Sequence, residues 1–85
     1  MSNYQATRSK NDDEVLQLFA QNLRACRQAK GVSQEELAFL AGFSRSYYSE
    51  IETGKRNLSL LNLVKLLAVL EVDANALLSV REGQE

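Results

Sequence analysis

Residues 33–52 read SQEELAFLAGFSRSYYSEIE, and this stretch decides the fold that the sequence predicts. It favours two short helices joined by a turn at Gly42, because glycine readily adopts the left-handed backbone that ends many helices. The second helix carries small polar and basic residues on one face, and Tyr48 and Ile51 on the other. Such a helix can dock by its apolar face while its polar face stays free to enter a groove of DNA. The stretch therefore predicts a helix-turn-helix.

Four helix starts share one pattern, an apolar residue followed by Ser or Asp, with another apolar residue five positions after the first. The Ser or Asp caps the first turn, and the two apolar residues pack against each other across it. The pattern occurs at Val32-Ser33…Leu37, Phe43-Ser44…Tyr48, Leu58-Ser59…Leu63 and Val72-Asp73…Leu77. Asn11, with Glu14 three residues later, marks a further start. Five helices are therefore expected, near residues 12–29, 34–41, 45–53, 60–70 and 74–79.

The apolar positions of these helices agree with a single core. Phe19, Leu23 and Cys26 recur at helical spacing in the first helix. We interpret Cys26 as a small core residue, with a redox-sensing thiol as the alternative. Because the chain has no proline and no alternating strand pattern, the predicted fold class is all-α. The first three helices are expected to end at glycines, namely Gly31, Gly42 and Gly54.

The segment 60–70, LLNLVKLLAVL, is apolar on nearly every side. A domain of this size cannot bury all of it in its own core. The excess predicts a second apolar surface, most simply the interface of a homodimer. The residues expected at this interface are Leu61, Val64, Leu77, Leu78 and Val80. The alternative is a buried central helix with some exposed leucines.

Composition limits the classes of function that the chain can perform. Its 85 residues, 45% hydrophobic and 25% charged, suit one small globular domain. Histidine is absent and there is one cysteine, so a zinc site, an internal disulfide and Ser-His catalysis lack their residues. We therefore expect no metal, no cofactor and no enzyme. The predicted organisation is a mobile arm at 1–11, a helix-turn-helix domain with dimerisation helices at 12–80, and a polar tail at 81–85.

The location and charge of the chain also bear on its partners. Its first residues lack the apolar run of a signal peptide or membrane span, so we expect a cytoplasmic protein and no membrane partner. The net charge is −1, but six basic and four acidic residues between Arg24 and Arg56 leave that segment at +2. Phosphates sense the local field within about 10 Å at moderate salt, so this distribution permits DNA binding.

The chain resembles the Cro/repressor-like helix-turn-helix regulators, also called the xenobiotic-response-element family. The resemblance covers roughly residues 15–80 and implies a compact five-helix, lambda-repressor-like fold. It also implies a protein associated with the nucleoid of a bacterium or with phage DNA. It rests on Leu23-Arg24…Arg27…Lys30 through Ala38, on AGFS at 41–44, on IETGKRNLSL at 51–60, and on Leu63, Leu66, Leu70, Val72, Leu77 and Leu78. Leu61 and Leu67 depart from it, because the family more often has a polar residue and alanine there.

A narrower resemblance links the chain to the controller proteins of restriction-modification systems. It rests on RSYYSEIE at 45–52, RNLSL at 56–60 and LEV at 70–72. It implies a small dimer that binds an operator upstream of its own gene and times the expression of the endonuclease. The alternatives are another small phage-type or stress repressor or antitoxin, and a helix-turn-helix adaptor that acts through protein contacts.

Four residues of the second motif helix are candidates for reading bases. Arg45 opens this helix, where its planar fork can bond O6 and N7 of guanine; a phosphate contact or a solvated side chain is the alternative. Ser46 and Ser49 lie on the same side and either donate to DNA or act as spacers. Glu50 either accepts from N4 of cytosine or orients Arg45.

Other residues are expected to contact the DNA backbone or to hold the reading helix. The resemblance assigns Gln34 to the DNA backbone and to bracing the reading helix, with helix capping as the alternative. It assigns Tyr47 to the backbone or to the shape of the DNA, with simple packing as the alternative. The remaining backbone candidates, each with a solvated side chain as alternative, are Arg24, Lys55, Arg56 and Asn57. The resemblance also pairs Arg27 with Glu52, which would lock the reading helix to the scaffold. The expected partners are a double-stranded DNA operator and a second copy of the chain, with RNA polymerase as a further candidate.

Overall fold

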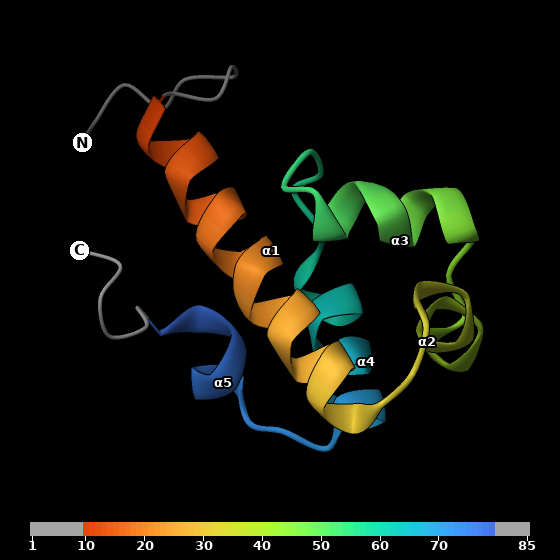
Figure 1. The fold of residues 1–85 in the computed structure, drawn as a ribbon. Helices are drawn as coiled ribbons and strands as arrows, with labels where there is room; N and C mark the ends of the chain where they lie inside the picture. The colour runs from red at the N-terminus through yellow and green to blue at the C-terminus, as the bar shows by residue number, and fades with distance from the viewer. Residues whose placement is uncertain (1–9, 80–85) are drawn as a thin grey trace.

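Five helices make up the described part of the chain, residues 10–79, in the computed structural model (Figure 1). They are α1 (Lys10–Lys30), α2 (Gln34–Ala41), α3 (Arg45–Glu52), α4 (Leu60–Leu70) and α5 (Ala74–Leu78). The all-α prediction is confirmed, and the observed bounds differ from the expected ones by at most two residues. Helix α1 begins at Lys10, so Lys10 and Asn11 are helical and are not part of an arm. Residues 1–9 and 80–85, which include Val80 and most of the predicted arm and tail, lie outside the described residues.

The predicted caps are present at the starts of four helices. In each case the side-chain oxygen of the cap accepts a hydrogen bond from the backbone N–H three residues later, at 3.0–3.3 Å. At the three serine caps the bond satisfies an N–H that the helix itself leaves without a partner, whereas the N–H of Ala76 also donates to the main-chain carbonyl of Asp73 at 3.1 Å. The four capping residues are Ser33, Ser44, Ser59 and Asp73.

Left-handed residues end several of the helices. Gly42 has φ 79° and follows α2, and the next N–H, that of Phe43, reaches back to the carbonyl of Ala38 at 2.8 Å. The turn between α2 and α3 is therefore fixed by a backbone bond that needs a glycine conformation. Helix α4 ends differently, because its left-handed residue is Glu71, with φ 60°. Nothing in the residue type of Glu71 predicts this conformation.

We expect Glu71→Gly to raise the free energy of unfolding by about 0.5–1 kcal/mol. A side chain in the left-handed region costs about 1–2 kcal/mol, and the greater freedom of an unfolded glycine cancels part of the gain. The exposed Lys30–Glu71 ion pair at 3.7 Å contributes little. Urea unfolding measures the change. Glu71→Ala is the control, because it removes the same carboxylate but keeps the strain; equal stabilisation by both substitutions would contradict this account.

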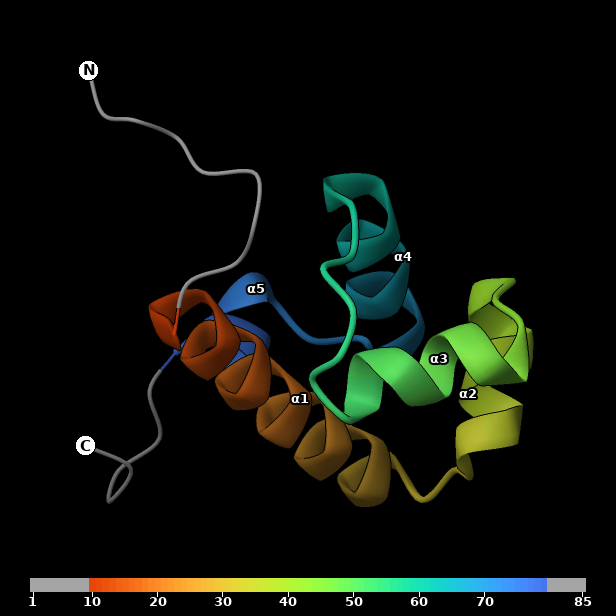
Figure 2. The same ribbon diagram turned by 90° about the horizontal axis from the view of Figure 1, so that it is seen from above.

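Helix α1 lies between α5 on one side and α3 on the other, while α2 packs against α3 and α4 (Figures 1 and 2). The core forms where their apolar faces meet, and Cys26 packs against it partly buried, as a core residue would. Its fully or nearly buried apolar members are Phe19, Leu23, Leu37, Ala38, Ala41, Tyr48, Ile51, Leu66, Leu70 and Leu77. Among the helices of residues 10–79, none is long and apolar enough to cross a membrane.

Candidate nucleic-acid interface

Helix α3 lies at an edge of the molecule (Figure 1), and burial divides its side chains into two faces. Tyr48 and Ile51 point into the core and are fully buried, as the sequence predicts. Arg45 and Ser46 are exposed at the start of the helix, and Ser49 is partly exposed one turn further on. The cap on Ser44 fixes the first turn, so the exposed residues project from a rigid helix end.

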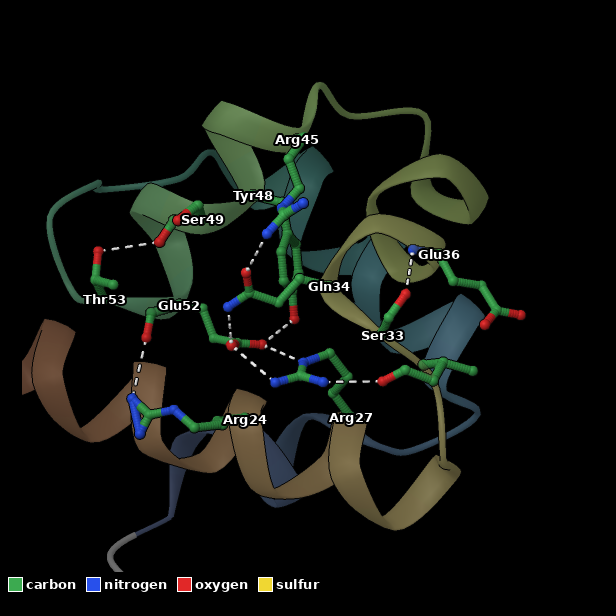
Figure 3. Close-up of polar contacts among 11 residues, drawn as sticks. Arg24, Arg27, Ser33, Gln34, Glu36, Arg45, Tyr48, Ser49, Glu52 and Thr53 are labelled. Atoms are coloured by element: carbon green, nitrogen blue, oxygen red, sulfur yellow. Dashed lines mark hydrogen bonds and ion pairs between the residues drawn. The ribbon is translucent and has the colours of Figure 1, made fainter.

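The inward face of α3 is held by a buried carboxylate, that of Glu52, which is 1% exposed (Figure 3). Arg27 of α1 donates to both of its oxygens, from Nε to Oε2 at 2.7 Å and from Nη2 to Oε1 at 3.1 Å. The Tyr48 hydroxyl donates to Oε2 at 2.5 Å, and Gln34 Nε2 donates to Oε1 at 2.6 Å. Arg27 also donates to the carbonyl of Val32 at 2.9 Å, which binds the turn before α2 into the same cluster. The described residues therefore pair Arg27 with Glu52, as the resemblance implied.

The pKa values of this cluster reflect its hydrogen bonds. Burial by itself raises the pKa of Glu52, but the bonds from Arg27, Tyr48 and Gln34 outweigh it and hold the pKa below the usual 4.5. Burial and the bond to the carboxylate together raise the pKa of the Tyr48 hydroxyl. The bond to Glu52 raises the pKa of the Arg27 guanidinium. At neutral pH the cluster therefore contains a carboxylate, a guanidinium and a neutral phenol.

We expect part of the stability to be lost in acid through Glu52. Its folded pKa lies below the unfolded value, so its contribution is fully present above about pH 4.5 and is lost as pH falls through the folded pKa. Urea unfolding of the wild type and of Glu52→Gln between about pH 7 and pH 3 measures this contribution. The variant should be less stable at neutral pH and should lose less stability on acidification. Parallel pH profiles would contradict the role of Glu52.

Gln34 connects this cluster to the exposed end of α3. Its amide nitrogen binds Glu52, and its amide oxygen accepts a hydrogen bond from Nη2 of Arg45 at 3.3 Å (Figure 3). The interpretation of Glu50 as the residue that orients Arg45 is therefore wrong in this structure. The carboxylate of Glu50 instead accepts from Nε of Arg56 at 3.0 Å. Gln34 performs the bracing role, because its short amide spans the distance from the buried carboxylate to Arg45.

The expected backbone-contacting residues surround α3. Arg24 donates from Nη2 to the main-chain carbonyl of Glu52 at 3.2 Å, at the end of the helix. Lys55, Arg56 and Asn57 are exposed in the loop that follows α3. Tyr47 is partly buried: its ring meets the edge of Phe43 at 5.1 Å between ring centroids. This contact agrees with the packing role of Tyr47 and does not test a contact with DNA.

Sequence reasoning missed two asparagines with structural roles. Asn62 of α4 donates from Nδ2 to the Tyr47 hydroxyl at 2.8 Å and so connects α4 to the reading helix. Asn22 is buried in α1 and donates to the carbonyls of Leu77 and Ser79, at 3.0 and 2.9 Å, which fastens the end of α5. Asn62 interrupts the apolar run 60–70, and Asn22 follows Phe19 by three residues and precedes Cys26 by four, on the apolar side of α1; these positions were the available signal.

The candidate dimer residues fall into two groups. Leu61, Val64 and Leu78 expose 74%, 52% and 51% of their surface, and Leu60 beside them exposes 73%. Leu77 does not belong with them, because it is completely buried in the core of the monomer. Its prediction as an interface residue is wrong: α5 turns this side chain inward and leaves its neighbour Leu78 outside.

A short helix with a buried inner face and a free polar outer face, joined by a tight turn to the helix before it, is the arrangement of a helix-turn-helix. The chain matches the family model described as "Helix-turn-helix" over residues 23–77. It belongs to this family of DNA-binding transcriptional regulators, and within the family it is close to the restriction-modification controller proteins. Both resemblances drawn from the sequence are thereby confirmed.

Three relatives illustrate the likeness. The control protein C.BamHI of Bacillus amyloliquefaciens is 45% identical over 62 residues, which cover 72% of this chain and 76% of that protein. The crystal structure of the controller protein C.AhdI from Aeromonas hydrophila has 50% sequence identity and a TM-score of 0.70, and the match covers 73% of this chain and 94% of that one. A hypothetical transcription factor of Neisseria meningitidis is 40% identical over 68 residues. The match covers 80% of this chain and 64% of that protein, so the chain spans just under two thirds of its length.

Proposed function

We propose that this chain is a dimeric controller protein of a restriction-modification system that binds a palindromic operator through α3. One observation carries the proposal. Arg45 stands exposed at the capped start of α3, and Gln34 ties it to the buried Glu52 cluster that fixes the helix. Because this bond uses one nitrogen of an exposed side chain, the guanidinium can turn its planar fork to a guanine in the major groove.

In the proposed complex, the exposed face of α3 reads the bases. Arg45 bonds O6 and N7 of guanine, while Ser46, Ser49 and Glu50 complete the face. Six residues around α3 position the domain on the phosphates without carrying much sequence information. They are Arg24, Gln34, Tyr47, Lys55, Arg56 and Asn57.

The dimer in this proposal forms through the exposed apolar side chains of α4 and α5. Leu61, Val64 and Leu78, with Leu60 beside them, are the residues whose burial would stabilise it. A two-fold axis there would place the two α3 helices in successive major grooves, about 34 Å apart. In this proposal the protein acts in the cytoplasm, where it binds DNA and catalyses no reaction. RNA polymerase is a further partner at the operator.

Selection of binding sites from random DNA tests the proposal, followed by titration of the enriched site at several salt concentrations. The expected result is a two-fold-related motif with guanines in each half. The logarithm of the affinity should fall with the logarithm of the salt concentration by about 0.9 for each neutralised phosphate. Weak binding without any motif would overturn the proposal and favour an adaptor that binds another protein.

A further inference from the structure

Arg56 is held by two groups on the surface that the proposed function turns toward DNA. Its Nε donates to Oε1 of Glu50 at 3.0 Å, and its Nη2 lies 2.8 Å from the same oxygen. Its guanidinium also lies over the ring of Tyr47, 5.0 Å from the centroid. The side chains of Arg56 and Glu50 are 49% and 46% exposed, so both can reach a ligand.

The position of Glu50 explains why this pair matters for DNA binding. Glu50 follows Ser46 by four residues on α3, so both project from the same side of the reading helix. A carboxylate there is repelled by phosphates, and an arginine there is attracted by them. While Glu50 and Arg56 are paired, their charges cancel locally. The region then exerts little electrostatic attraction on the phosphates of an arbitrary DNA sequence.

We infer that Glu50 is a positioning residue for specificity, which holds Arg56 away from DNA until the operator supplies a partner for Glu50. This inference rests on the proposed function. On random DNA, releasing Arg56 to a phosphate leaves the Glu50 carboxylate without its cation and facing negative charge. On the operator, the N4 amino group of a cytosine can donate to Glu50, so that both members of the pair exchange one partner for another. The exchange favours the operator over other sequences.

The test compares wild type, Glu50→Gln, Arg56→Gln and the double variant on the selected operator and on random duplex DNA. Glu50→Gln keeps the size of the side chain but frees Arg56 for a phosphate. Its affinity for random DNA should rise about tenfold per subunit at about 0.1 M salt, and the salt slope should steepen by about 0.9 per subunit. Its preference for the operator should fall. In the Arg56→Gln background, the same change should raise the affinity for random DNA by a clearly smaller factor, because it then relieves only the repulsion between Glu50 and the phosphates and frees no arginine.

Glu71→Gln serves as the matched control, because Glu71 also forms an exposed ion pair, with Lys30 at 3.7 Å. Glu71 follows the last turn of α4, whereas the first turn of α4 contacts α3 through the bond from Asn62 to Tyr47. The control variant reports the effect of one lost negative charge alone. A rise with Glu50→Gln no larger than with Glu71→Gln, or an equal rise with and without Arg56, would overturn the inference. A wild-type protein without any sequence preference would instead overturn the proposed function, so the two failures are distinct.

Discussion

Replacing Arg27 by alanine is expected to lower the free energy of unfolding by about 3–5 kcal/mol. The substitution removes both donors that Arg27 gives to Glu52. Among residues 10–79 it leaves a carboxylate that is 1% exposed with only Tyr48 and Gln34 as partners. An unpaired buried charge lowers the free energy of unfolding by far more than the intact ion pair adds to it. The free energy of unfolding of a small domain is about 5–15 kcal/mol in total, so the variant should be marginally folded. Urea and thermal unfolding measure the loss.

Arg56→Ala is the matched control for this prediction. Arg56 also binds one glutamate, Glu50, at 2.8 Å, but both side chains are about half exposed. Exposed pairs contribute about 0–1 kcal/mol, so its loss should be small. Adding Glu52→Gln to Arg27→Ala should restore part of the stability, because no charge is then left buried. Equal stability of Arg27→Ala and wild type would show that the Glu52 cluster does not hold α3.

The features that the sequence predicted well are local ones. The caps on Ser33, Ser44 and Ser59 depend on the residue and its near neighbours, so the helix starts could be read directly. The left-handed conformation of Glu71 could not be predicted, because the chain has no glycine at that turn and glutamate does not favour this conformation. A turn can be located from the sequence only where it contains a residue, such as glycine, that favours the turn conformation.

The candidate site divides in the same way. The residues that face outward on α3 could be predicted from hydrophobic periodicity alone, whereas the side chains that they bond to could not. Glu50 had two interpretations, and the choice of Arg56 as its partner depends on how the loop after α3 folds back. Leu77 failed for a related reason: an apolar residue in a five-residue helix can face either side, and only the packing of α5 on α1 decides. Hydrophobic periodicity predicts which residues share a face of a helix. It does not predict which other element packs against that face.

Replacing Arg45 by alanine is expected to abolish most of the preference for the operator while leaving the fold intact. A bidentate contact with guanine is worth about 1–3 kcal/mol of discrimination, or about 5- to 150-fold for each half-site. Arg45 is exposed and makes one described hydrogen bond, to Gln34 at 3.3 Å, so the free energy of unfolding should change little. Titration of operator and random DNA, together with urea unfolding, measures both quantities.

Two further variants separate base reading from attraction to phosphates. Arg45→Lys keeps the positive charge but loses the planar fork, so the salt slope should persist while discrimination falls. Lys55→Ala, in the exposed loop after α3, should weaken binding to operator and random DNA by similar factors. If Arg45→Ala behaved like Lys55→Ala, Arg45 would be a phosphate contact. The bond to Gln34 would then serve to hold α2 against α3, and the specificity of the protein would have to come from the serines of α3 or from the shape of the DNA.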